Sequence, residues 1–423
     1  MLLVAGCYER FVFGYQWDAD KSALVKVFTN PSHRGPVRSM AAAGALLAVG
    51  GSEDMVHVYD LRSNKDLGMV MVPGEGSVSS LALFTPEGRL APTHLFTGSG
   101  DGSISFFGLR AGDWECMRTI NRAHSKEVAA VSVHPSGKLA LTAGREGVLK
   151  MWELTRGRCT YTTKLAGPPE GMAFSPSGLA YAIAVGDALT VHGVVEADKR
   201  AVFKHERRVL CHAFHGDDAV VTGCEDGSLS VWSVKTGERL VHVPQAHDSR
   251  VRALSLLPET RVPGAAGVLG AESAAQGPLP TRVFSASSDG SIKVWDFTKS
   301  ATEPIAELAT RARLTCLVSM LDTQQLAALA PLQLPLKAPT APRPRPSKEE
   351  GDEGKGDRPA KAPKDKPFGE APAGVVDFLG EEDEKAQRAK QASVRAKLAK
   401  RKRSGKAGGL PGPRGGAVRK AVR

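Results

Sequence analysis

This 423-residue sequence lacks the features that mark several common functional classes. No run of about 18 apolar residues occurs, so we expect no transmembrane helix, and the N-terminus has no basic leader typical of a signal peptide. The six cysteines are scattered without a CxxC pair, which argues against a cysteine zinc site and favours reduced thiols. Neither a phosphate-binding GxxxxGKS/T loop nor an HExxH motif is present. We therefore expect no membrane association, no cofactor, no metal and no catalytic activity.

The sequence does contain a repeated unit, which the stretch 283–297 shows most clearly. Apolar residues alternate along two short segments of this stretch, and that pattern predicts two strands. Asp289-Gly290 lies between the two segments and suits the left-handed backbone of a tight hairpin turn. The pair Trp295-Asp296 then closes the unit.

The unit recurs with the period of a propeller blade. Its closing aromatic residues are 45 positions apart between Phe107 and Trp152 and 80 positions, or two periods, apart between Trp152 and Trp232. A four-stranded propeller blade repeats about every 40–45 residues. In the units that end at Phe107, Trp152, Trp232 and Trp295, an acid lies six positions before the aromatic residue, and a hydroxyl residue lies four positions before the acid. Two units also carry a histidine further upstream, at His124 and His247.

These features resemble a WD40 repeat, and the resemblance implies a role for the recurring polar residues. In WD40 proteins a histidine, a hydroxyl, an acid and a tryptophan form a buried hydrogen-bonded chain, so that each polar group finds a partner. The fullest set here is His247, Ser285, Asp289 and Trp295, and the partial sets contain Thr97, Asp101, His124, Thr142, Glu146, Trp152, Thr222, Asp226 and Trp232. A catalytic triad is the alternative, but an enzyme needs one triad and not several partial ones. We interpret the sets as structural.

The sequence predicts an all-β fold, a seven-bladed WD40 β-propeller over residues 1–330. The sequence contains six full units and two partial units, one before the first full unit and one after the last. Residues 1–28 resemble the last three strands of a blade, with Gly14 aligned to Tyr59, and residues 313–320 resemble a first strand. We expect these two segments to form the last blade together, because closure removes the open edges of the sheet.

Two units depart from the common pattern. The fourth has no tryptophan, and His192 lies near its aromatic position. The sixth is longer than the period because of an insertion at 258–280, rich in Gly, Ala and Pro. We interpret this insertion as a surface loop between the first two strands of that blade.

The positive charge of the chain is confined to its C-terminal part. Residues 331–423 contain 23 lysines and arginines against 12 acids, whereas the remaining residues contain 33 of each. This part is rich in Pro, Lys and Glu, so we expect a disordered basic tail. Lys400, Arg401, Lys402 and Arg403 are consecutive and predict a nuclear or nucleolar signal that also contacts RNA phosphates. The alternative is a solvated tail that only maintains solubility.

Beyond the repeat, residues 1–317 resemble the p21-activated protein kinase-interacting protein 1 family. The similar blocks are LLVAGCYERFVFGY, AHSKEVAAVSVHPSGKLALTAGREGVLKMW, and VFSASSDGSIKVWDF with ARLTCL. The resemblance implies a non-enzymatic scaffold of the nucleus and nucleolus that acts in 60S ribosomal subunit biogenesis and pre-rRNA processing. It also implies a negative regulator that binds p21-activated kinase. The implied partners are pre-60S particles, their assembly factors and the kinase, with unspecific rRNA contact through the tail. We expect a monomer outside these complexes.

One further motif leaves an alternative function open. Tyr59-Asp60-Leu61-Arg62 resembles the Trp-Asp-x-Arg signature of propellers that are substrate receptors of cullin-type ubiquitin ligases, with Tyr in place of Trp. Arg62 could equally pair with a neighbouring acid. All of these functions use the same fold, so the fold alone does not separate them.

Overall fold

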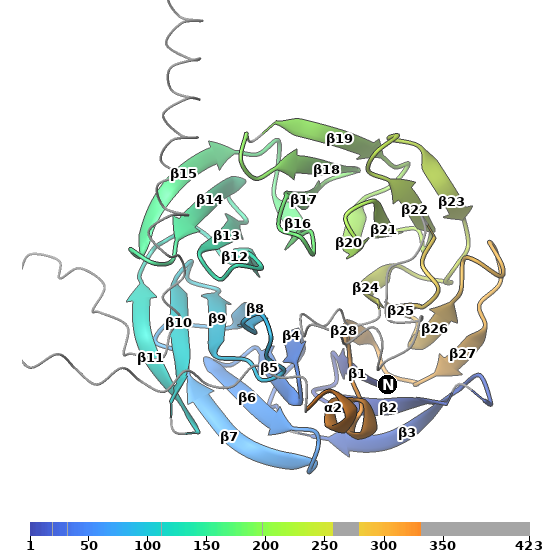
Figure 1. Ribbon diagram of the computed structural model, residues 1–423, viewed down its shortest axis with the longest axis horizontal. Coiled ribbons are helices and arrows are strands. Elements are labelled where there is room, and N and C mark those ends of the chain that lie inside the picture. The colour runs from blue at the N-terminus through green and yellow to red at the C-terminus, as the bar shows by residue number, and fades with distance from the viewer. Residues whose placement is uncertain (19, 32, 111, 197, 257–278, 331–423) are drawn as a thin grey trace, which may run out of the picture. The chain divides into compact units, whose positions relative to one another are not determined.

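The computed structural model describes residues 1–330, except 19, 32, 111, 197 and 257–278. Its strands form seven four-stranded antiparallel sheets arranged as blades around a ring (Figure 1). The predicted all-β, seven-bladed propeller is confirmed. The predicted tail, 331–423, and residues 258–278 of the predicted insertion lie outside the described residues. No helix in the described part of the chain has the length and apolar character needed to cross a membrane.

We number the blades from the first one that is continuous in sequence. Blade 1 contains β4 (Val37–Ala43), β5 (Leu46–Gly51), β6 (Met55–Asp60) and β7 (Lys65–Met71). Blade 2 contains β8 (Val78–Phe84), β9 (His94–Ser99), β10 (Ile104–Arg110) and β11 (Asp113–Ile120). Blade 3 contains β12 (Val128–Val133), β13 (Leu139–Gly144), β14 (Val148–Glu153) and β15 (Arg158–Lys164). Blade 4 contains β16 (Pro169–Phe174), β17 (Ala180–Val185), β18 (Ala188–Gly193) and β19 (Lys199–Lys204).

The remaining blades complete the ring. Blade 5 contains β20 (Val209–His215), β21 (Ala219–Cys224), β22 (Leu229–Ser233) and β23 (Arg239–Val243). Blade 6 contains β24 (Val251–Leu256), β25 (Val283–Ser287), β26 (Ser291–Trp295) and β27 (Ala306–Ala309). Blade 7 contains β28 (Leu314–Met320), β1 (Leu2–Cys7), β2 (Val12–Asp18) and β3 (Ala23–Asn30), and a short helix, α2 (Thr323–Leu329), follows β28.

Blade 7 joins the two ends of the described chain in one sheet. Strand β28 pairs antiparallel with β1, from Leu2 opposite Met320 to Cys7 opposite Leu314. The hydroxyl of Thr315 on β28 donates 2.8 Å to the carbonyl oxygen of Val37, which begins blade 1. Pairing β28 with β1 closes the ring, and the first strand of blade 7 thereby contacts blade 1 directly.

The turn between the second and third strands of a blade packs against the following blade. In blade 5 this turn contains Gly227, whose φ of 86° is favourable only for glycine. A Cβ atom at Gly227 would overlap the backbone oxygen of His247, and the His247 amide donates 3.1 Å to the Gly227 carbonyl. The Asp-Gly pair therefore forms the hairpin turn and also allows the segment that leads into the next blade to pack closely against it.

The hydrophobic core lies between neighbouring blades. Trp295 of blade 6 packs against Val221 and Val231 of blade 5, and Trp152 of blade 3 packs against Phe106 of blade 2. Each aromatic residue near the end of a third strand is thus inserted into the preceding blade. The tryptophans that recur in the sequence therefore form packing contacts between neighbouring blades.

The predicted alignment of Gly14 with Tyr59 is wrong by one residue. The ladder between third and fourth strands shifts its register just before the aromatic position, between Val58 and Tyr59 in blade 1 and between Gly14 and Tyr15 in blade 7. Tyr15 therefore takes the place of Tyr59 and packs against blade 6. Gly14 faces the other way and is covered by the ring of a phenylalanine on β3, which leaves no space for a Cβ atom.

Candidate functional site

The most complete polar chain lies in blade 3. The ring of His124 contacts the Thr142 hydroxyl through Nε2 (2.8 Å) and Glu146 Oε1 through Nδ1 (2.6 Å). The indole N–H of Trp152 donates to the same hydroxyl at 2.8 Å. Because a carboxylate only accepts, Nδ1 of His124 carries the proton and Nε2 accepts from the threonine. Burial lowers the pKa of His124, which keeps the ring neutral in this chain.

Blade 6 has a similar chain, although Asp289 is not joined to it as predicted. Ser285 Oγ lies 2.7 Å from His247 Nε2 and accepts the indole N–H of Trp295 at 2.8 Å. His247 Nδ1 contacts the hydroxyl of Ser291 at 2.7 Å, whereas the nearest Asp289 oxygen is 3.7 Å away. The set that the sequence suggests to be the fullest is therefore less direct than that of blade 3.

Asp289 instead fixes the backbone around the chain. Its carboxylate accepts the amide of Ser291 at 2.7 Å and that of Asp248 at 3.2 Å. We expect Asp289→Ala to lower the free energy of unfolding by about 1–3 kcal/mol, because two backbone donors lose their partner. Asp289→Asn keeps one acceptor oxygen and should lose less. Chemical denaturation measures both; an unchanged unfolding free energy with lost partner binding would identify Asp289 as an interface residue instead.

Sequence reasoning missed the histidine of blade 5. His205 Nε2 lies 2.9 Å from the Thr222 hydroxyl and accepts the indole N–H of Trp232 at 3.1 Å. Asp226, predicted for this set, accepts the amide of Ser228 at 3.0 Å. His205 does not follow an alanine, which is why the pattern overlooked it. Its spacing of 17 residues to the hydroxyl, against 18 from His124 to Thr142, would have found it.

The predicted set in blade 2 forms no chain within the described structure. The Thr97 hydroxyl is fully buried and has no hydrogen-bond partner among the described residues. Phe107 occupies the tryptophan position and has no N–H to donate. The Asp101 carboxylate accepts hydrogen bonds from the amides of Ser103 (2.8 Å) and Glu75 (3.1 Å) and so stabilises the turn that contains it. The predicted signal at Lys400, Arg401, Lys402 and Arg403 lies outside the described residues.

These buried histidines make stability depend on pH. Burial lowers the pKa of His247 to about 4, against 6.5 for an ordinary histidine. Between those values the unfolded chain binds the proton and the folded chain does not, so stability falls as the pH falls. We expect a loss of up to about 1.4 kcal/mol per pH unit for this histidine. Urea unfolding at pH 7.5 and pH 5 tests the prediction, and equal stability at both would contradict it.

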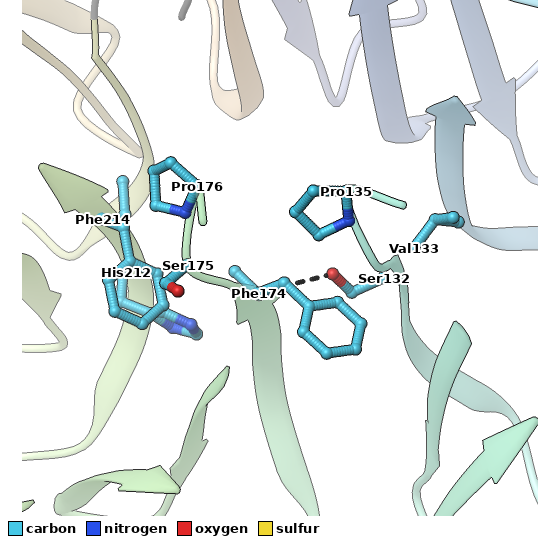
Figure 2. Close-up of a pocket in the computed structure, with 10 residues that line it drawn as sticks. Ser132, Val133, Pro135, Phe174, Ser175, Pro176, His212 and Phe214 are labelled. Carbon is cyan, nitrogen blue, oxygen red and sulfur yellow. Dashed lines mark hydrogen bonds between the residues drawn. The ribbon is translucent and has the colours of Figure 1, made fainter. Parts of the chain in front are cut away.

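A cavity of about 350 Å³ lies where the first strands of blades 3, 4 and 5 meet (Figure 2). Pro135 and Pro176 lie in turns at its rim, and the amide of Phe174 donates 3.2 Å to Ser132 Oγ. The full lining is Ser132, Val133, Pro135, Ala173, Phe174, Ser175, Pro176, His212, Ala213 and Phe214. It contains no carboxylate, lysine or arginine, so it suits an apolar or uncharged peptide group. No motif of the sequence singled it out.

Arg62, the residue on which the ubiquitin-ligase alternative depends, pairs with a neighbouring acid. Arg62 donates from Nε and Nη2 to the two carboxylate oxygens of Asp60, each at 3.3 Å. This geometry corresponds to the alternative in which Arg62 pairs with a neighbouring acid. The guanidinium is largely exposed, so the pair contributes little to stability.

The chain matches the family model described as "WD domain, G-beta repeat" at residues 69–107, 114–153, 198–233 and 238–296. Each matched segment begins at or near the outer strand of one blade and ends with the third strand of the next. Blade 7 is divided at a different place: its first strand, β28, comes late in the described chain, and its other three strands are the first three of the chain.

Relatives that match about three quarters of the chain extend this result. A p21-activated protein kinase-interacting protein 1-like protein of Danio rerio is 30% identical over 320 residues, covering 74% of this chain and 79% of the relative. A protein of the same name from Xenopus laevis is 28% identical, covering 76% and 82%. Shk1 kinase-binding protein 15 of Schizosaccharomyces pombe is 25% identical, covering 75% and 84%. With 30% identity over about three quarters of the chain, the chain belongs to the p21-activated protein kinase-interacting protein 1 family of WD40 scaffolds.

Proposed function

We propose that this chain is a non-enzymatic scaffold whose propeller binds and negatively regulates a p21-activated kinase. The observation that carries the proposal is the similarity to relatives named for kinase interaction or kinase binding, which covers about three quarters of this chain. The described polar chains support it as well, because their hydrogen bonds are internal to the blades. They stabilise a rigid ring and leave its faces for partners.

Direct binding to the kinase tests this proposal. Full-length protein and a chain ending at Ala330 should bind p21-activated kinase with equal affinity, because the interaction needs only the propeller. Both should also reduce kinase activity in proportion to binding. Calorimetry and a kinase assay measure these effects. The proposal fails if the intact protein does not bind, and the assignment to the propeller fails if only the shorter chain loses affinity.

We also propose a role in nucleolar 60S ribosomal subunit biogenesis and pre-rRNA processing. The resemblance of the sequence motivates this role, and so does its charge distribution: a propeller without net charge and an excess of 11 basic residues in 331–423. Such a basic segment adds salt-dependent affinity for rRNA phosphates without base specificity. In sucrose gradients of nuclear extract, we expect the protein to sediment with pre-60S particles. Recovery only at the top of the gradient would exclude the role.

Nuclear and nucleolar localisation belongs to the same proposal. Replacing Lys400, Arg401, Lys402 and Arg403 with alanine should shift a fluorescent fusion towards the cytoplasm without changing its melting temperature. Unchanged nucleolar accumulation would show that the localisation signal lies elsewhere in the chain. We do not propose the ubiquitin-ligase function, because its motif has Tyr59 in place of Trp and the relatives are named for kinase interaction or kinase binding.

A further inference from the structure

Blade 1 contains a polar set that differs from the chains of the other blades. His33 precedes β4, and Glu53 lies six positions before Tyr59, so these two residues occupy the histidine and acid positions. Val49 stands ten positions before Tyr59, where the other sets have a hydroxyl. His57 lies opposite Val49 on the neighbouring strand. Blade 1 therefore has a valine at the hydroxyl position and a second imidazole opposite it.

The two imidazoles are buried but lack the hydrogen-bond partners that His124 and His247 have. His33 is 3% exposed and His57 6%, and none of their four ring nitrogens has a hydrogen-bond partner among the described residues. By contrast, both nitrogens of His124 and both of His247 have partners within 2.8 Å. Buried polar groups in folded proteins are almost always paired, and here four unpaired nitrogens lie on two neighbouring rings, which points to a shared ligand.

Side-chain packing alone does not account for the arrangement. The two rings pack edge to face, with centroids 4.4 Å apart. This contact packs the carbon atoms of the two rings but gives their nitrogen atoms no hydrogen-bond partner. Glu53 lies at the same place: its Oε1 accepts the amide of Arg34 at 2.5 Å, which leaves the second oxygen available.

We propose that His33, Glu53 and His57 bind a divalent transition-metal ion of the Zn²⁺ type. One donor atom from each residue lies within 4.8 Å of the other two. Imidazole and carboxylate donors form known zinc sites at about 2.0–2.2 Å from the metal, with a fourth position for water. In a tetrahedral site the donors are about 3.4 Å apart, so binding draws the three side chains together. His33 and Glu53 lie outside the strands, whereas His57 lies within β6.

The site goes beyond the scaffold function and has a structural consequence. It joins the segment before β4 to the β5–β6 turn and to β6, three parts of blade 1 that meet beside blade 7. Binding would therefore lock the blade next to the ring closure. Cysteine spacing gave no indication of this site, because its ligands are histidines and an acid that only the fold brings together.

Cobalt titration of the full chain tests the proposal, since tetrahedral Co²⁺ absorbs strongly in the visible range. Cys116 and Cys159 are exposed and should first be replaced by serine to remove competing thiolates. We expect one Co²⁺ per chain, loss of its absorption in His57→Leu, and at least tenfold weaker binding in Glu53→Gln. His242→Gln removes a histidine of blade 5 outside the site and is the matched control. Equal titrations of the parent and of His57→Leu would overturn the proposal.

Thermal unfolding provides a readout that does not depend on the spectrum. Zn²⁺ should raise the melting temperature of the parent and of His242→Gln by a few degrees, because it binds the folded state. It should raise that of Glu53→Gln less, because this variant binds the metal more weakly, and its partly exposed side chain can change without disturbing the core. Without metal, His57→Leu should melt at or above the parent, since it removes an unpaired buried ring. A parent that does not respond to Zn²⁺ would contradict the proposal.

Discussion

A chain that ends at Ala312 is expected not to fold cooperatively, whereas a chain that ends at Ala330 is expected to melt as the intact propeller does. The difference is β28 and the helix after it. Leu314, Leu317 and Met320 of β28 are buried. Each contributes about 1.5–3 kcal/mol of hydrophobic stabilisation, together about 5–9 kcal/mol, against about 5–15 kcal/mol for a whole domain. Truncation also leaves β1 as an unpaired edge.

Several contacts to the neighbouring blades disappear with the same strand. Ser319 contacts Ser255 of blade 6 at 2.9 Å, and Thr315 donates to the carbonyl of Val37 in blade 1. Circular dichroism and urea unfolding measure the loss. A peptide of residues 312–322 added to the shorter chain should restore a cooperative transition by completing blade 7. If the chain ending at Ala312 unfolds like the one ending at Ala330, closure through β28 does not determine stability.

The sequence contained enough to predict the propeller because a periodic fold repeats its local signals. The Asp-Gly turns and the closing aromatic residues each recur at the blade period, so that errors in one unit do not change the fold class. The polar chains of blades 3 and 6 were also indicated, because His124 and His247 stand at recurring positions. In both blades the predicted histidine, hydroxyl and tryptophan lie in hydrogen-bond contact.

What escaped prediction depends on register and on contacts between segments. A bulge in the outer ladder lies just before Tyr15 and just before Tyr59, and this register, which spacing does not reveal, makes Tyr15 and not Gly14 the counterpart of Tyr59. Residue spacing also does not show which donor a carboxylate accepts. Asp289 was therefore assigned to His247, although its oxygens accept the amides of Ser291 and Asp248. The cavity beside Phe174 comes from three blades and has no local signature.

Thr142→Val should be among the most destabilising single substitutions of a polar residue in this protein. The Thr142 hydroxyl accepts the indole N–H of Trp152 and meets Nε2 of His124, and all three side chains are buried. Valine keeps the shape of threonine and removes only the hydroxyl. Two buried groups then lose their partner at about 1–3 kcal/mol each. We expect the free energy of unfolding to fall by about 2–6 kcal/mol in urea denaturation.

Thr97→Val is the matched control, because Thr97 holds the same position in blade 2 and is equally buried. Its hydroxyl has no hydrogen-bond partner among the described residues, and Phe107 beside it has no N–H to leave unpaired. The same substitution should therefore leave stability unchanged or raise it by about 1 kcal/mol, since it removes an unsatisfied buried group. Equal losses at both positions would mean that valine disturbs the packing of the second strand. In that case the hydrogen-bonded chain would not explain the effect of Thr142.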